Sequence, residues 1–162
     1  MPSDVSPVVS PVASPDVTLD ARAEDNGLAN MLATLVRQNL EANPHKRTEF
    51  EGLSGRIAIV AEDVDVALTL AFERGGKLTV YDGISGIPDV TIRGPSEAIM
   101  ALSNIPSTTP LGLPIPEPKD REGALAAQTV FGALLGGKLH IHGLPARLPL
   151  FLKLGHIMSV NG

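Results

Sequence analysis

The sequence predicts an α+β fold in which a five-stranded, mostly antiparallel sheet is covered on one face by helices. Segments between residues 55 and 142 alternate apolar and polar residues with a period of two, as half-buried strands do. Short turns separate most of them, which favours antiparallel pairing with one apolar face. Segments before and after them repeat apolar residues with helical spacing, so helices are available to cover that face.

The composition excludes several classes of protein. The net charge is −5 and aromatic residues make up 3 % of the chain, which argues against nucleic acid as a partner. The chain contains no cysteine, so disulfides and thiolate chemistry are excluded. No apolar run approaches the length that spans a bilayer. The beginning of the chain lacks the features of a secretory signal, so we expect a cytoplasmic protein.

The chain divides into a tail and one domain. Residues 1–25 are rich in proline and serine, which predicts a disordered tail, and residues 26–162 then form a single domain. The domain opens with a helix that Pro44 ends, since proline disfavours helical backbone in the residue before it. One face of this helix carries the apolar residues Leu28, Met31, Leu32, Leu35, Val36 and Leu40.

Four strands follow the first helix. We expect them at residues 57–59, 66–72, 77–81 and 90–93, where apolar residues alternate with polar or small ones. Gly75 and Gly76 supply the positive φ angles of a tight hairpin turn. We therefore expect consecutive strands to pair in antiparallel fashion.

Helices and a proline-rich loop come next. Residues 95–102 predict a short helix, with proline at a tolerated first-turn position. Residues 104–120 contain five prolines and predict a long loop of the kind that forms lids or is disordered. Residues 121–136 predict a helix without charge from Gly123 onward, which must be buried or contact lipid.

The last part of the domain combines a strand and a helix. Residues 138–142 predict a fifth strand, in which two histidines share the face opposite the apolar residues. Residues 146–158 predict the last helix, and Pro149 fits only in its first turn.

No motif in the chain indicates an enzyme. Gly132 to Leu139 resembles a phosphate-binding loop, but leucine replaces the magnesium-binding Ser/Thr, and the order is helix then strand instead of strand then helix. His140 and His142 could bind a metal only with further ligands, so two solvent-facing histidines are the better interpretation. His156 suits a helix C-terminus. We expect no catalytic residue, no metal site and no cofactor.

The chain carries more apolar residues than a small domain needs. Its mean hydropathy is +0.15. The excess lies in the uncharged helix, the last helix and the proline-rich loop. Two interpretations follow: an ordinary solid core with an interface to a partner or a second copy, or an aliphatic cavity between sheet and helices.

The order of the elements resembles the sterol carrier protein 2 (SCP2) family. The resemblance runs from Phe50 to Met158 and is strongest in the segments PDVTI and GGKLHIHG. The segment 104–120 departs from the family, since it is longer and richer in proline than the usual link. The resemblance implies a sheet and helices that enclose an apolar tunnel.

The resemblance also implies a non-catalytic lipid-binding or lipid-transfer protein. Its ligand would be a sterol, fatty acid, acyl-CoA, phospholipid or prenyl chain, with transient membrane contact. Arg147, Lys153 and His156 could meet head groups, although a solvated helix face is the simpler role for them. From the sheet we expect the lining residues Leu68, Leu70, Phe72, Leu78, Val80 and Ile92. From the covering helices we expect Met100, Phe131, Leu134, Leu135, Leu148, Phe151 and Leu152.

Two alternatives stay open. The apolar surface could instead dock a partner protein or a second copy, with a solid interior and no ligand. An enzyme that uses His140 and His142 with a metal is the weaker alternative, and it would require a bound metal ion in stoichiometric amount.

Overall fold

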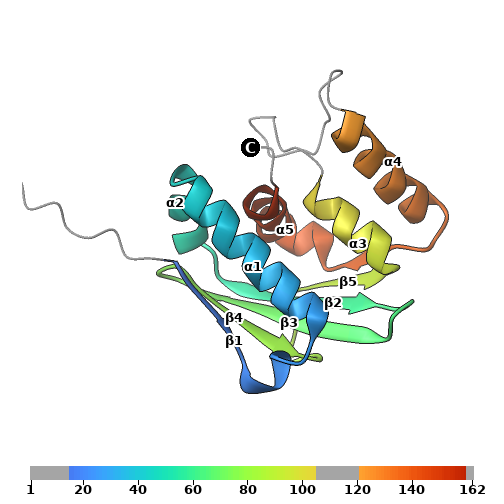
Figure 1. Cartoon of the computed structure of the whole chain (residues 1–162). Coiled ribbons are helices and arrows are strands. Elements are labelled where there is room, and N and C mark those ends of the chain that lie inside the picture. Colours follow the sequence, from blue (N-terminus) through green and yellow to red (C-terminus); the bar gives the residue numbers. More distant parts are fainter. Residues whose placement is uncertain (1–14, 105–120, 160–162) are drawn as a thin grey trace, which may run out of the picture.

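The computed structural model describes residues 15–104 and 121–159, and it shows an α+β fold with a six-stranded mixed sheet (Figure 1). The strand order is β1-β4-β3-β2-β5-β6. The strands are β1 (Asp16–Leu19), β2 (Gly55–Ala61), β3 (Val66–Glu73), β4 (Lys77–Asp82), β5 (Val90–Gly94) and β6 (His140–His142). The helices are η1 (Ala21–Ala23), α1 (Gly27–Ala42), α2 (His45–Glu51), α3 (Ser96–Ser103), α4 (Arg121–Leu135) and α5 (Leu144–Met158).

Strand β1 corrects the predicted number of strands and the predicted end of the tail. It pairs in parallel with β4, with Val17 opposite Leu78. Val17 is buried, and the guanidinium of Arg37 donates to its carbonyl with an Nη2–O distance of 2.7 Å. The strand has only four residues, and one of them is buried. Its apolar pattern is too short to be recognised in a sequence segment rich in proline. Residues 1–14 of the predicted tail lie outside the described residues.

The pairing of β5 also differs from the prediction. Strands β2, β3 and β4 pair in antiparallel order as expected, but β5 pairs in parallel with β2, so that Ile59 lies opposite Ile92. The connection 83–89 therefore crosses from β4 past β3 and β2. The Thr69 hydroxyl on β3 donates to the Gly83 carbonyl at 2.8 Å and accepts from the Ser85 amide at 2.9 Å. These bonds hold the connection against the sheet face opposite the helices.

The helices cover the other face in two groups. Helix α1 lies over β1, β3 and β4, and it confirms the predicted first helix. Helices α3 and α5 lie over β5, beside α1 (Figure 1). Helix α2 was not predicted, because its seven residues lack a helical apolar repeat, and it packs on α5.

Helix α4 has the predicted extent but not the predicted place. It packs on the outer side of α3 and not on the sheet (Figure 1). Its buried residues are mostly small and form one narrow stripe that suits close packing on another helix: Gly123, Ala126, Ala127, Val130 and Ala133. The helices that face the sheet across the expected cavity are therefore α3 and α5, and α4 is not one of them. The predicted loop 104–120 lies outside the described residues, apart from Asn104.

Helix α5 contains a break that explains its proline. Arg147 has φ −127° and ψ 24°, which is not helical, so the helix restarts after it. Pro149 then lies in the first turn of the second segment, as predicted, where no helical partner for an N–H is needed. Helix α5 begins two residues earlier than predicted, and strand β6 is two residues shorter at its start.

Candidate functional site

An apolar pocket lies between the sheet and helices α3 and α5. Its volume is about 60 Å³. Strands β2 and β5 form its floor with one isoleucine each, and the two helices form its walls. The lining residues are Ile59, Ile92, Ile99, Leu102, Ser103, Phe151, Leu152, Leu154, Gly155 and Met158.

The pocket offers almost no polar chemistry. Among these described lining residues only Ser103 has a polar side chain, and its hydroxyl donates to the Met100 carbonyl of its own helix at 2.6 Å. The proton of this hydroxyl already has an acceptor, so the hydroxyl needs no hydrogen bond from a ligand. The walls can therefore select a guest by its apolar surface and shape.

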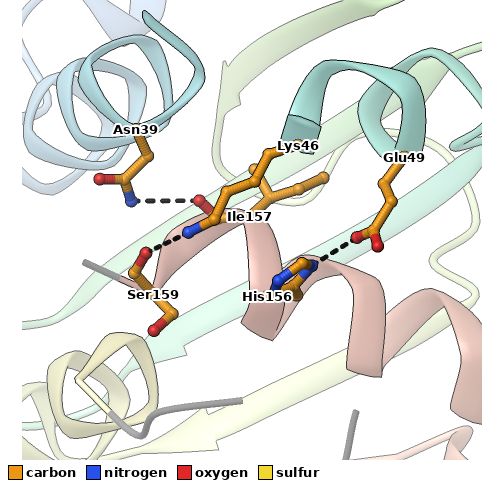
Figure 2. Close-up of polar contacts among 6 residues, drawn as sticks. All are labelled: Asn39, Lys46, Glu49, His156, Ile157 and Ser159. Atoms are coloured by element: carbon orange, nitrogen blue, oxygen red, sulfur yellow. Dashed lines mark hydrogen bonds and ion pairs between the residues drawn. The ribbon is translucent and has the colours of Figure 1, made fainter. Parts of the chain in front are cut away.

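Helix α5 supplies half of the lining and is fixed at its C-terminal end by polar contacts (Figure 2). The Asn39 amide on α1 donates to the carbonyls of Ile157 at 3.1 Å and Met158 at 2.8 Å. The Lys46 amine on α2 donates to the Ser159 carbonyl at 2.7 Å. These carbonyls lie at or just beyond the end of the helix, where backbone carbonyls have no intrahelical N–H donor.

Lys46 is a fully buried lysine. Burial lowers the pKa of its amine, because the charged form loses hydration, and the nearby Glu49 carboxylate opposes this in part. Next to it, the buried Ser159 hydroxyl has no hydrogen-bond partner among the described residues. The lysine therefore works as a C-terminal cap for α5, with its stem in the core.

His156 makes a third contact at this end of α5. Its Nδ1 lies 2.5 Å from a carboxylate oxygen of Glu49 on α2 (Figure 2). It sits in the last turn of the helix, where the sequence placed it. Its main partner is thus a side chain on another helix, which the sequence did not reveal.

The N-terminal end of α5 is held by a close backbone approach and an ion pair. Gly143, just before the helix, has φ +89°, and a Cβ there would lie 2.2 Å from the Asp89 carbonyl oxygen. The Asp89 carboxylate accepts from the Arg56 amide at 2.8 Å and pairs with the Arg147 guanidinium at 2.9 Å. Asp89 thus joins the start of β2 to the break in α5.

The structure brings three of the predicted lining residues to the pocket: Ile92, Phe151 and Leu152. Five others point to the same sheet face but fill the core, and they are Leu68, Leu70, Phe72, Leu78 and Val80. They lie on β3 and β4, which α1 covers, whereas the pocket lies over β2 and β5. Alternation predicted the correct face but not the helix that covers each strand.

The remaining predicted residues lie outside this pocket. Met100 lines a groove of about 510 Å³ between α3 and α4. Phe131, Leu134 and Leu135 on α4 and Leu148 on α5 are exposed. Lys153 is exposed as well, in agreement with a solvated helix face.

Five apolar lining residues were missed: Ile59, Ile99, Leu102, Leu154 and Met158. Ile59 belonged to a predicted strand, and Ile99 and Leu102 to a predicted helix. Their apolar pattern marked them as core, and only the packing of α3 beside α5 distinguishes them from other core residues.

The histidines of β6 point to solvent, as expected. His140 and His142 are both exposed, and their rings stack with centroids 6.3 Å apart. Within residues 15–104 and 121–159 there is no group of three or more His, Asp or Glu side chains that could hold a metal ion. In the same residues, no helix is both long enough and apolar enough to cross a membrane.

Comparison with known proteins adds a family and a fold. The family model of the SCP-2 sterol transfer family matches residues 32–110. A solved structure of a UbiJ-SCP2 ubiquinone synthesis protein matches with a TM-score of 0.52 and 15 % identity, over 80 % of this chain and 90 % of that one. No curated protein matches the chain.

A second solved structure is less similar. It is a solution structure of a conserved hypothetical protein from Thermus thermophilus, described as a candidate sterol carrier protein. It has a TM-score of 0.38 and 14 % identity, over 82 % of this chain and 88 % of that one.

Proposed function

The chain carries an SCP-2 sterol transfer family domain, and from this premise we propose that it is a non-catalytic lipid carrier whose guest occupies the pocket between β2, β5, α3 and α5. The domain is a lipid-binding domain by family. The proposal adds the location of the ligand and its class, which is a molecule with a long aliphatic portion.

The observation that carries the proposal is a pocket lined by aliphatic and aromatic side chains with no free polar group among the described ones. Binding in such a pocket is stabilised only by the burial of the apolar surface of the guest. Each methylene taken out of water contributes about 0.8 kcal/mol, so a chain of about a dozen contributes on the order of 10 kcal/mol before the costs of immobilisation. A sterol, a fatty acyl chain and a prenyl chain all satisfy this requirement.

The pocket must widen to hold such a guest. A volume of about 60 Å³ is room for a few water molecules. Helix α5 is the wall that can yield, because it is broken at Arg147 and provides half of the lining. Its C-terminal end is capped by Asn39 and Lys46, so we expect the segment around Phe151 and Leu152 to move most.

Gly155 gives a direct test. It lines the pocket, and a Cβ built on it meets no heavy atom within 4 Å. In the variant Gly155→Leu a side chain fills space that the guest needs. Binding of a fluorescent fatty acid, followed by titration of the full chain, is expected to weaken by at least about tenfold, since a few buried methylenes of the probe are displaced.

Gly132→Leu is the matched control. Gly132 is also a helical glycine with open space at its Cβ, but it lies on α4 and outside the pocket. This variant is expected to bind the probe like the natural chain, and thermal unfolding of both variants checks that they fold. If the natural chain binds no probe and no lipid is extracted from it, the interaction-module alternative with a ligand-free core replaces the carrier. Equal probe binding by both variants would show that the guest does not occupy this pocket.

A further inference from the structure

Helix α4 exposes four large apolar side chains, of which Leu125 also lines the groove between α3 and α4. The exposed fractions are 63 % for Leu125, 51 % for Phe131, 38 % for Leu134 and 90 % for Leu135. We call these four residues the α4 outer face. Helix α4 buries only its stripe of mostly small residues against α3, so its large side chains stay in water. An exposed apolar cluster of this kind marks an interaction surface.

The charges around the α4 outer face differ from those of the whole chain. From Gly123 to Gly137 the sequence contains no ionisable side chain. Arg121 and Glu122 precede this stretch and Lys138 follows it, which gives a local charge of +1 in a chain whose net charge is −5. A stretch without anionic side chains between residues 123 and 137 is not repelled by a bilayer that contains anionic lipid, and Lys138 at its end is attracted to it.

We propose that the α4 outer face docks on the surface of a lipid bilayer. The proposal rests on the proposed carrier function, because a lipid guest has to be collected from a membrane and returned to it. Helix α3 connects the two sites. It packs against α4 on one side and lines the pocket with Ile99 and Leu102 on the other. When α4 docks on the bilayer, α3 is the helix that lies between α4 and the pocket that holds the guest.

The size of the face favours a bilayer over a second copy of the chain. A large side chain covers at most about 150–250 Å² when fully buried, so four partly exposed ones offer on the order of 400 Å². A stable protein interface buries about 800 Å² on each partner. A bilayer needs no such area, because shallow insertion of a few side chains and attraction to anionic lipid together give reversible binding.

The test compares two equally exposed residues. Leu135 on α4 and Ile87 on the 83–89 connection are each 90 % exposed. The natural full chain, Leu135→Asp and Ile87→Asp are floated with vesicles of phosphatidylcholine and phosphatidylglycerol. We expect the natural chain and Ile87→Asp to float. The partition coefficient of Leu135→Asp is expected to fall about tenfold, because an anion replaces an inserted apolar side chain.

Several outcomes would overturn the proposal. The natural chain could fail to float, or Ile87→Asp could lose as much binding as Leu135→Asp. Light scattering could show a dimer that Leu135→Asp converts to a monomer, in which case a second copy covers the face. Binding of a fluorescent fatty acid without vesicles separates this proposal from the carrier function. If no variant binds the probe while flotation still depends on Leu135, the pocket proposal fails and the docking proposal stands.

Discussion

At the scale of single residues, the end of α5 depends on polar contacts from α1 and α2, and two of the groups that make them, Asn39 and Lys46, are buried. Asn39, Lys46 and the Glu49–His156 pair all join this end of α5 to α1 and α2 (Figure 2). A buried amine or amide costs free energy unless it is bonded, and each of these donors meets a carbonyl or a carboxylate. The position and stability of the pocket wall are therefore set outside the pocket.

Replacement of Asn39 by alanine tests this arrangement. Asn39→Ala removes two hydrogen bonds and leaves buried carbonyls of α5 with one partner fewer, so we expect the free energy of unfolding to fall by about 1–3 kcal/mol. Denaturant titration measures the change. Asn43→Ala is the control, since Asn43 follows α1 directly, is only half-buried, and bonds through its side chain to the Asn39 carbonyl of α1 and not to α5. Equal losses in both variants would show that the hydrogen bonds from Asn39 to α5 stabilise the fold no more than an ordinary local hydrogen bond does.

Lys46 predicts a dependence of stability on pH. Burial lowers the pKa of its amine below the ordinary value of 10.5, so near that value the unfolded chain holds the proton more firmly than the folded one. The free energy of unfolding of the natural chain, relative to Lys46→Met, should therefore rise as the pH increases toward 10.5. Denaturant titrations at neutral and alkaline pH measure this difference. A difference that is constant or falls with pH contradicts the interpretation.

These residue roles could be predicted only in part. The sequence placed His156 in a last helical turn and His140 and His142 on an outward face, because spacing alone decides those positions. The sequence around Lys46 contains no pattern that predicts the burial of this side chain. A lysine among charged residues is normally exposed, and only the packing of α2 on α5 buries it.

At the scale of elements, the entry into α5 is a tightly constrained junction, because backbone lies close to its glycine. Gly143→Ala combines a φ of +89° with a Cβ only 2.2 Å from the Asp89 carbonyl oxygen. We expect the free energy of unfolding to fall by at least about 2 kcal/mol, as measured by denaturant titration.

Gly137→Ala separates the two causes. Gly137 also has a positive φ, of +65°, but a Cβ there meets no atom within 4 Å. It should cost only the conformational term of about 1 kcal/mol. If Gly143→Ala costs no more than Gly137→Ala, the close approach to Asp89 does not constrain the junction.

Elements with long periodic patterns were predictable, and their partners were not. The periodicity of α1 and the alternation of β3 and β4 define these elements in the sequence itself. The parallel pairing of β5 with β2 depends on a connection that crosses two strands. The lack of charge in α4 predicted a helix that is buried or contacts lipid, but it did not predict that a stripe of mostly small residues packs on α3.

At the scale of the whole molecule, the helix layer divides the sheet into two regions. Over β3 and β4, α1 completes a solid core, and over β2 and β5 the meeting of α3 and α5 leaves the pocket. Predicted lining residues on β3 and β4 thus became core, while Ile92 on β5 and Phe151 and Leu152 on α5 reached the pocket. This division follows from tertiary packing, which a single sequence does not specify.

The same division separates two sites on opposite sides of α3. The pocket lies on its inner side and the α4 outer face is displayed beyond its outer side. A carrier that takes up an apolar guest from a bilayer needs both a cavity and a contact surface, and α3 is the element they share.

Native mass spectrometry of the freshly purified full chain tests the central claim most directly. The account predicts a folded monomer that carries one non-covalent lipid, and the adduct should be depleted in Gly155→Leu but kept in Gly132→Leu. A natural chain that appears only at its own mass, and that takes up no fatty acid or sterol added in excess, would contradict the account.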